Sequence, residues 1–166
     1  MTQVLISIGS NLNDPSRQVL AAMDVLEARF GTIKRSELYE TEPVGLTSDQ
    51  NFINAALVVN TDLSAHATLS ILLDIETQAG RVRSPGSAYE SRQLDLDIIL
   101  YGEAILDDQI KVPHPRFRQR RFVLEPAAEI APDMVDPLTS MSLAQLLEIC
   151  PDTNEVRKVE ASVIAS

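Results

Sequence analysis

The chain of 166 residues has few aromatic side chains: three tyrosines, four phenylalanines and no tryptophan. Its core must therefore be built mainly from Leu, Ile, Val and Ala, and the length suits one domain. The single cysteine, Cys150, excludes an internal disulfide and is typical of a reducing compartment. There is no apolar run as long as a membrane span and no basic leader, so we expect a cytoplasmic protein that does not enter a membrane.

Positive charge is also scarce. Lys and Arg number 14 against 24 Asp and Glu, which gives a net charge of −10. General nucleic-acid binders use a broad positive surface, so we expect no nucleic-acid partner. The arginines are instead concentrated in two segments, 81–92 and 116–121. Such local positive charge on an acidic protein favours a small anionic ligand.

Several common catalytic motifs are missing from the sequence. It has no Gly-rich P-loop ending in Lys-Ser or Lys-Thr, no dinucleotide-binding glycine fingerprint, no His-Glu-x-x-His and no Cys-x-x-Cys. Ser10 also lacks the flanking Gly-x-Ser-x-Gly pattern of a hydrolase nucleophile elbow. These absences exclude the enzyme classes that depend on those motifs.

Hydrophobic periodicity and turn residues predict an alternation of strands and helices. In order we expect a strand at 4–8, a helix from Asp14 to Gly31, strands at 34–42 and 52–60 separated by a loop at 43–51, a helix from Ser64 to Gly80, and a strand at 93–101. This order is the βαββαβ pattern of the ferredoxin-like split βαβ fold, an α+β class with an antiparallel sheet, helices on one face and the other face open to a site. Residues 1–152 would form the domain, with a rigid loop at 112–115, a short helix at 141–150 and a tail at 153–166.

The strand around Asp95 and Asp97 carries the clearest chemical signal. Side chains alternate along a strand, so these two carboxylates share one face while Leu94, Leu96 and Ile98 share the other. Two neighbouring carboxylates repel each other, and a divalent cation would compensate both; this is how Mg²⁺ is commonly held beside phosphates. Arginines precede the pair, as in polyphosphate sites. The alternative is a half-buried strand with a solvated acidic face.

Two further groups of residues have binding potential. His114 lies between Pro113 and Pro115, which restrict the backbone and hold the imidazole in place. Phe52 and Asn54 share a strand face, where an aromatic plane and an amide would suit a flat heterocycle. The alternatives are a histidine that satisfies a loop carbonyl, a core phenylalanine with a polar neighbour and, for the arginines of 116–121, a solvated basic patch.

Six blocks of sequence in this order resemble the 6-hydroxymethyl-7,8-dihydropterin pyrophosphokinase family of folate biosynthesis. The similarity runs from Val4 to Pro132. No single block is specific, but their combined order and spacing are. The blocks are Gly9-Ser10-Asn11-Leu12, Tyr39-Glu40-Thr41-Glu42-Pro43-Val44-Gly45, Phe52-Ile53-Asn54-Ala55-Ala56, Glu76 with Gly80-Arg81-Val82-Arg83, Arg92-Gln93-Leu94-Asp95-Leu96-Asp97, and Val112-Pro113-His114-Pro115-Arg116 with Arg120 and Phe122.

The resemblance implies a Mg²⁺-dependent enzyme in which the pterin hydroxymethyl oxygen attacks the β-phosphorus of ATP and AMP leaves. Asp95 and Asp97 would hold two Mg²⁺ ions, and Arg81 and Arg92 would neutralise developing charge. We expect a monomer, with a weak dimer as the alternative. ATP would be bound by Glu76, Arg83, Tyr89, Ile98, Lys111, His114 and Arg120. The pterin would be bound by Thr41, Glu42, Val44, Phe52, Asn54 and Phe122.

One segment departs from the family pattern. The family usually has Gly, followed by Pro or Ala, just before the arginine of the Asp-x-Asp block, whereas this chain has Ala88-Tyr89-Glu90-Ser91-Arg92. Glu90 adds negative charge where ATP would bind. Two alternatives therefore stay open: a non-catalytic relative that binds nucleotide or pterin, and a metal-dependent phosphodiesterase that uses the same carboxylates.

Overall fold

The computed structural model describes residues 1–11, 14–31, 34–41, 51–79 and 94–159. Within these ranges no helix is both long enough and apolar enough to span a bilayer. The elements, in chain order, are β1 (Thr2–Ser10), α1 (Pro15–Phe30), β2 (Lys34–Arg35), β3 (Tyr39–Thr41), β4 (Phe52–Thr61), α2 (Ala65–Gln78), β5 (Asp95–Tyr101), β6 (Leu106–Asp107), β7 (Lys111–Val112), the 3₁₀ turn η1 (Phe117–Gln119), α3 (Arg121–Ile130), α4 (Leu143–Glu148) and β8 (Arg157–Lys158).

The main sheet is antiparallel and has the strand order β5-β1-β4-β3-β8, with β2 also pairing to β4. β1 lies inside the sheet, between β4 and the edge strand β5. Five of the predicted elements form with bounds within a few residues of those expected from the sequence: the strands at 4–8, 52–60 and 93–101 and the helices from Asp14 to Gly31 and from Ser64 to Gly80. An α+β fold built on an antiparallel sheet is therefore confirmed.

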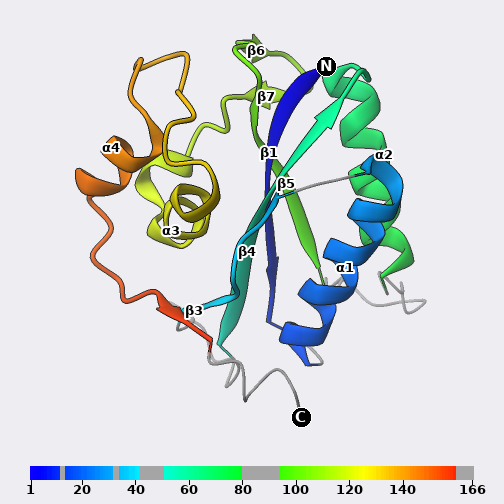
Figure 1. Cartoon of the computed structure of the whole chain (residues 1–166), viewed down its shortest axis with the longest axis horizontal. Coiled ribbons are helices and arrows are strands. Elements are labelled where there is room, and N and C mark those ends of the chain that lie inside the picture. The colour runs from blue at the N-terminus through cyan, green and yellow to red at the C-terminus, as the bar shows by residue number, and fades with distance from the viewer. Residues whose placement is uncertain (12–13, 32–33, 42–50, 80–93, 160–166) are drawn as a thin grey trace, which may run out of the picture.

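Both faces of the sheet are covered by helices (Figure 1). On one face, Val4, Ile6 and Ile8 of β1 pack into the core that includes side chains of α1 and α2. On the other face, Leu5 belongs to a second core, with Phe117 and residues of α3 and α4. The expectation that helices pack on one face of the sheet and leave the other face free is therefore wrong, because α3 and α4 pack on that second face. Apolar residues occur at both odd and even positions along β1, so both faces of the strand are apolar. This explains why helices pack on both sides of the sheet.

The predicted strand 34–42 is divided into β2 and β3. Lys34 and Arg35 pair with β4 in one register, and Tyr39 onward pairs in a register shifted by one residue. At the interruption, Ser36 Oγ accepts a hydrogen bond from the backbone N–H of Ala56 (2.8 Å). An extra residue on one strand of an antiparallel pair is a β-bulge, and alternation of side chains alone does not predict it.

Helix α3 was not predicted from the sequence. Pro126 lies inside it, and proline usually indicates the end of a helix because it lacks a backbone N–H donor. Long-range contacts hold α3 in place: Tyr39 Oη donates to Glu129 Oε1 (2.7 Å), and the backbone N–H of Glu37 donates to the same carboxylate. Residues 153–159, which the sequence assigns to a tail, include β8, which pairs with β3.

Candidate functional site

A cavity of about 400 Å³ opens at one end of the sheet, between the ends of β1, β4 and β5, the start of α3 and the C-terminal segment. A cavity of this size matches small-molecule sites, which bury most of a ligand. It brings together residues that lie up to 149 positions apart in the chain, between Ser7 and Val156. Seven residues predicted from the sequence line it: Thr41, Phe52, Asn54, Asp95, Asp97, Arg120 and Phe122.

The acidic end of the cavity is formed by Asp95 and Asp97 of β5. Both side chains are exposed, while Leu96 between them is buried, so the two carboxylates share one face as predicted. The register of the sheet places Ser7 beside Asp97 and Gly9 beside Asp95. The small neighbours on β1 leave space in front of both carboxylates, which can accept a hard cation and the oxygens of a phosphate.

The other end of the cavity carries the aromatic and amide groups. Phe52 and Asn54 project from β4, and Asn54 is only 4% exposed. Asn54 Nδ2 donates to Thr41 Oγ1 on the neighbouring strand (3.2 Å). This bond holds the plane of the amide, so that its remaining donor and acceptor positions can read the edge of a flat ring.

Arg120 and Phe122 enter the cavity from the start of α3. The guanidinium carbon of Arg120 lies 5.7 Å from the centroid of the Phe122 ring, within the range of a cation–π contact. The backbone N–H of Arg120 donates to the carbonyl of Phe117, which is fully buried. A rigid turn therefore presents a cation and an aromatic plane side by side.

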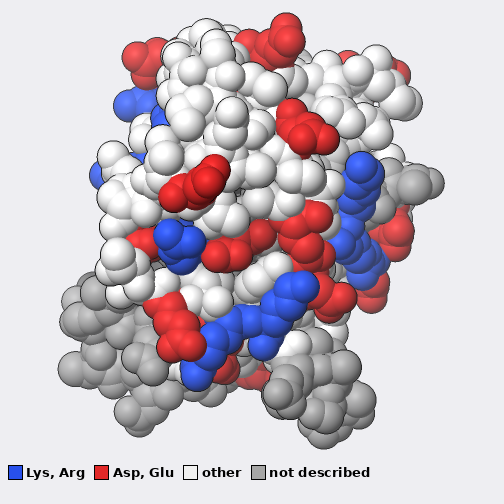
Figure 2. Space-filling view, turned by 60° about the vertical axis from the view of Figure 1, so that its left-hand side comes forward, with Lys and Arg blue, Asp and Glu red and all other residues white. Residues whose placement is uncertain are grey.

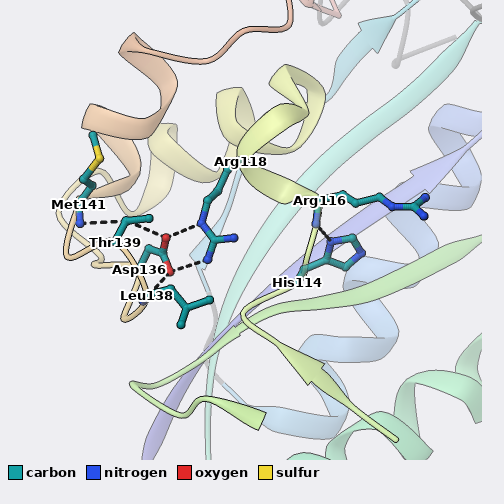
Figure 3. A network of polar contacts seen from close by, with 7 residues as sticks. All are labelled: His114, Arg116, Arg118, Asp136, Leu138, Thr139 and Met141. Atoms are coloured by element: carbon teal, nitrogen blue, oxygen red, sulfur yellow. Dashed lines mark hydrogen bonds and ion pairs between the residues drawn. The ribbon is translucent and has the colours of Figure 1, made fainter. Parts of the chain in front are cut away.

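The other described arginines of 116–121 do not form one solvated patch. Arg118 makes a two-pronged ion pair with the fully buried Asp136, with Nε–Oδ2 at 2.6 Å and Nη2–Oδ1 at 2.8 Å (Figure 3). Arg121 binds the backbone and side chain of the segment near Asp152 and also pairs with Glu125. Within this run, only Arg120 lines the cavity.

His114 lies beside the cavity rather than in its lining. Its backbone N–H donates to the carbonyl of Ile99 (2.9 Å), and its Nδ1 accepts the backbone N–H of Arg116 (3.1 Å; Figure 3). Burial lowers the pKa of His114; the charge of Asp97 opposes this, while Arg120 and Arg116 add to it. The ring is therefore neutral at pH 7, and because Nδ1 accepts a hydrogen bond, the proton is on Nε2, where it can be donated to a phosphate oxygen.

Three other predicted residues are described but do not line the cavity. Glu76 is buried, and its Oε2 accepts the backbone N–H of Leu96 (2.7 Å), which joins α2 to β5. Ile98 is buried in the core on the α1 and α2 face, and Lys111 is exposed on β7 with Nζ 4.0 Å from Asp107. Six predicted residues lie outside the described part of the chain: Glu42, Val44, Arg81, Arg83, Tyr89 and Arg92.

The cavity also includes residues that the sequence analysis missed. Ser7 and Gly9 line it because they alternate with the buried residues of β1, a signal that was present in the sequence. Ile99 and Val123 contribute apolar surface. Asp152, Asn154 and Val156 come from the segment that had been predicted to be a tail, and no local pattern marked them.

The protein surface near α3 and α4 carries charges of both signs. Figure 2 shows basic side chains in short stretches bordered by acidic ones on the face that includes this side of the molecule. Inside the cavity, Asp95, Asp97 and Arg120 bring charges of both signs together.

Comparisons with known proteins agree on one family. The family model of 7,8-dihydro-6-hydroxymethylpterin-pyrophosphokinase (HPPK) matches residues 5–132. A 2-amino-4-hydroxy-6-hydroxymethyldihydropteridine pyrophosphokinase of Pseudomonas aeruginosa is 39% identical over 152 residues, covering 90% of this chain and 92% of the relative. The protein of the same name from Methylorubrum extorquens is 38% identical, covering 81% and 86%.

Solved structures support the same fold. A crystal structure of Plasmodium falciparum HPPK-DHPS with pteroate has a TM-score of 0.69 and 14% identity, and the similarity covers 89% of this chain. Only 42% of the Plasmodium chain is covered, so this chain spans less than half of that protein. The likeness therefore concerns the fold alone.

Proposed function

Because the chain belongs to the 7,8-dihydro-6-hydroxymethylpterin-pyrophosphokinase family, we propose that it transfers pyrophosphate from ATP to 6-hydroxymethyl-7,8-dihydropterin. The products are the pterin diphosphate and AMP, and the reaction belongs to folate biosynthesis. The observation that carries this proposal is the cavity itself, which has two carboxylates at one end and an aromatic and amide site at the other. A pterin ring suits the aromatic and amide end and a polyphosphate suits the acidic end, so the two substrates need both ends in a single cavity.

The pterin would bind at the end formed by Phe52, Asn54 and Phe122. Two aromatic planes offer stacking surfaces to a flat heterocycle, and the buried amide of Asn54 offers directional hydrogen bonds to its edge. Thr41 holds that amide in place. Glu42 and Val44 are proposed as further pterin contacts on the basis of the family resemblance.

The donor set at the acidic end fits magnesium. Two exposed carboxylates on one strand face match a cation that takes one or two carboxylates and completes its shell with phosphate oxygens and water. We propose that Asp95 and Asp97 hold two Mg²⁺ ions. Mg²⁺ bound there would neutralise phosphate charge and would polarise the reacting phosphoryl group.

ATP would lie with its phosphates between Asp97, Arg120 and His114. The guanidinium of Arg120 and the Nε2–H of neutral His114 can each donate to a phosphate oxygen. By the resemblance, Arg81 and Arg92 would neutralise developing charge, and the remaining nucleotide contacts would come from Glu76, Arg83, Tyr89, Ile98 and Lys111.

In the reaction, a new bond forms between the pterin hydroxymethyl oxygen and the β-phosphorus of ATP. The bond between the β-phosphorus and the bridging oxygen of the α-phosphate breaks, and AMP leaves with that oxygen. The hydroxyl proton is released. Transfer of this kind depends on positioning and charge neutralisation, which are the properties that this cavity provides.

Further properties follow from the same proposal. The strand order β5-β1-β4-β3 with two crossover helices supports a ferredoxin-like split βαβ core. We propose one catalytic domain in residues 1–152, to which the following segment is joined by the pairing of β8 with β3. The protein would act in the cytoplasm as a monomer on small molecules, without a nucleic-acid or membrane partner.

Chromatography of the nucleotides tests the function. The protein is incubated with ATP and Mg²⁺, with and without 6-hydroxymethyl-7,8-dihydropterin. We expect AMP only when the pterin is present, with one pterin diphosphate for each AMP. AMP formed without pterin would instead indicate a phosphodiesterase-type activity, and bound ATP without any AMP would indicate a non-catalytic relative.

A further inference from the structure

The segment 152–159, here called the C-terminal strap, is fastened to the start of α3 at its first residue. Asp152 Oδ2 accepts the backbone N–H of Arg121 (3.1 Å), and Arg121 Nε donates to the carbonyl of Asp152 (2.8 Å). Arg121 is the first residue of α3, whose N–H lacks a partner within the helix. The aspartate therefore caps this helix and anchors the strap between Arg120 and Phe122 of the cavity wall.

The far end of the C-terminal strap is fastened to the edge of the sheet. Arg157 and Lys158 form β8 and pair with Glu40 and Tyr39 of β3. Arg157 Nη2 binds Glu40 Oε1 (3.0 Å), and the backbone N–H of Val159 donates to the carbonyl of Leu38 (2.8 Å). The strap is therefore fixed at both ends and spans from α3 to β3.

Between these two anchors, the C-terminal strap presents alternate residues to the cavity. Asn154 and Val156 line it, whereas Thr153 and Glu155 do not. Val156 is half-buried, and the other three residues are exposed. If the β3–β8 register is continued by one residue, Val156 lies opposite Thr41. Thr41 holds the amide of Asn54, so Val156 lies at the end of the cavity that carries the aromatic and amide groups.

We propose that Asn154 and Val156 form a wall of the pterin subsite and set its affinity and the size of the heterocycle it accepts. This inference rests on the proposed function. Val156 supplies apolar surface against the ring, and the Asn154 amide supplies a donor and an acceptor at its rim. Both residues lie beyond residue 132, where the match to the family model ends.

Steady-state kinetics of three variants tests the proposal. Val156→Ala removes apolar contact, Val156→Thr keeps the volume and adds a hydroxyl, and Asn154→Ala removes the amide. Each is expected to raise KM for the pterin several-fold, up to about tenfold, with KM for ATP and kcat nearly unchanged. Val156→Ile keeps the apolar contact and should retain the pterin affinity of the wild type. Glu155→Ala and Thr153→Ala are matched controls on the same segment and should behave as wild type.

Two results would overturn the proposal. One is a pterin KM unchanged in all three variants; the other is an equal loss for pterin and ATP, which would indicate a merely structural strap. Pterin binding measured directly by fluorescence distinguishes failure of the proposed wall from failure of the proposed function. If wild-type protein binds pterin but makes no AMP, the function fails while the variants still test the wall.

Discussion

Gly9 and Asn54 face each other across β1 and β4, and a Cβ placed on Gly9 would come within 3.1 Å of the Asn54 Oδ1 atom. This approach is tighter than ordinary van der Waals contact, so any larger residue at position 9 must displace the amide. On its other side, Gly9 is paired with Asp95. The absence of a side chain at this position therefore keeps open the floor of the cavity between the acidic end and the amide.

Replacing Gly9 tests this relationship. In Gly9→Ala, we expect KM for the pterin to rise by about tenfold, because the Asn54 amide must shift by a few tenths of an ångström and its bond to Thr41 weakens. The strand itself should tolerate alanine, which costs less backbone entropy than glycine. Thermal unfolding checks that the fold persists, and an unchanged pterin KM would contradict the assigned role of the amide.

Replacing Asp97 tests the metal site. We expect Asp97→Ala to abolish turnover, with a fall of at least roughly 100-fold, because the charge neutralisation that the carboxylate supports is worth several kcal/mol. The fold should remain, since this carboxylate is exposed on the strand face. Near-wild-type activity would mean that the metals are held elsewhere.

A matched control is available for the Asp97 variant. Asp62 lies just beyond β4, at the end of that strand away from Phe52, and its side chain is 77% exposed. Its carboxylate pairs with the N-terminal amine at 3.5 Å. Asp62→Ala removes a carboxylate of the same kind without touching the cavity, so its kcat and KM values should match wild type.

Replacing Asp136 tests whether its ion pair with Arg118 holds the loop after α3. Its buried carboxylate accepts hydrogen bonds from Arg118, from the Thr139 hydroxyl and from the backbone N–H of Leu138 (Figure 3). We expect Asp136→Ala to lower the free energy of unfolding by about 3 kcal/mol, because the half-buried Arg118 loses its partner. Chemical denaturation measures this change, and the exposed Asp133→Ala is the control. An effect below about 0.5 kcal/mol would show that the ion pair contributes little.

The Asp136 effect should depend on pH. Burial acts to raise the pKa of this carboxyl, but the hydrogen bonds from Arg118, Thr139 and Leu138 prevail, so the folded pKa is lowered. The carboxyl of Asp136 therefore binds a proton more readily in the unfolded chain than in the folded protein. The stabilisation is complete above the ordinary carboxyl value of about 4 and is lost as the pH falls through the lower folded value. Wild type and Asp136→Ala should thus converge in stability under acidic conditions; a constant difference would contradict the assignment.

The sequence predicted the central strands and first two helices because their signals are local. β5 alternates buried and exposed residues from Asp95 to Ile98, and Ser64 caps α2 through a bond from the backbone N–H of Ala67 (3.1 Å). Helix α3 was not predicted, because Pro126 is unfavourable inside a helix. The helix is stabilised by packing and by the hydrogen bond between the distant residues Glu129 and Tyr39. Tertiary contacts of this kind override local propensity.

The residues of the site also divide into those that the sequence could predict and those that it could not. Asp95, Asp97, Phe52 and Asn54 could be predicted because each pair is spaced by two on one strand. The strap residues Asn154 and Val156 could not, because their place depends on anchors more than 30 positions away, at Arg121, and more than 100 positions away, at Glu40.

Isotope tracing tests whether pyrophosphate is transferred in one step, by attack of the pterin oxygen on the β-phosphorus. ATP carrying ¹⁸O in the bridge between the α- and β-phosphates is incubated with the protein, Mg²⁺ and 6-hydroxymethyl-7,8-dihydropterin, and the products are analysed by mass spectrometry. We expect all of the ¹⁸O in AMP and none in the pterin diphosphate. Bridge ¹⁸O found in the pterin diphosphate or in free pyrophosphate would show that the bond between the α-phosphorus and the bridge oxygen breaks, which direct transfer of the pyrophosphate does not allow.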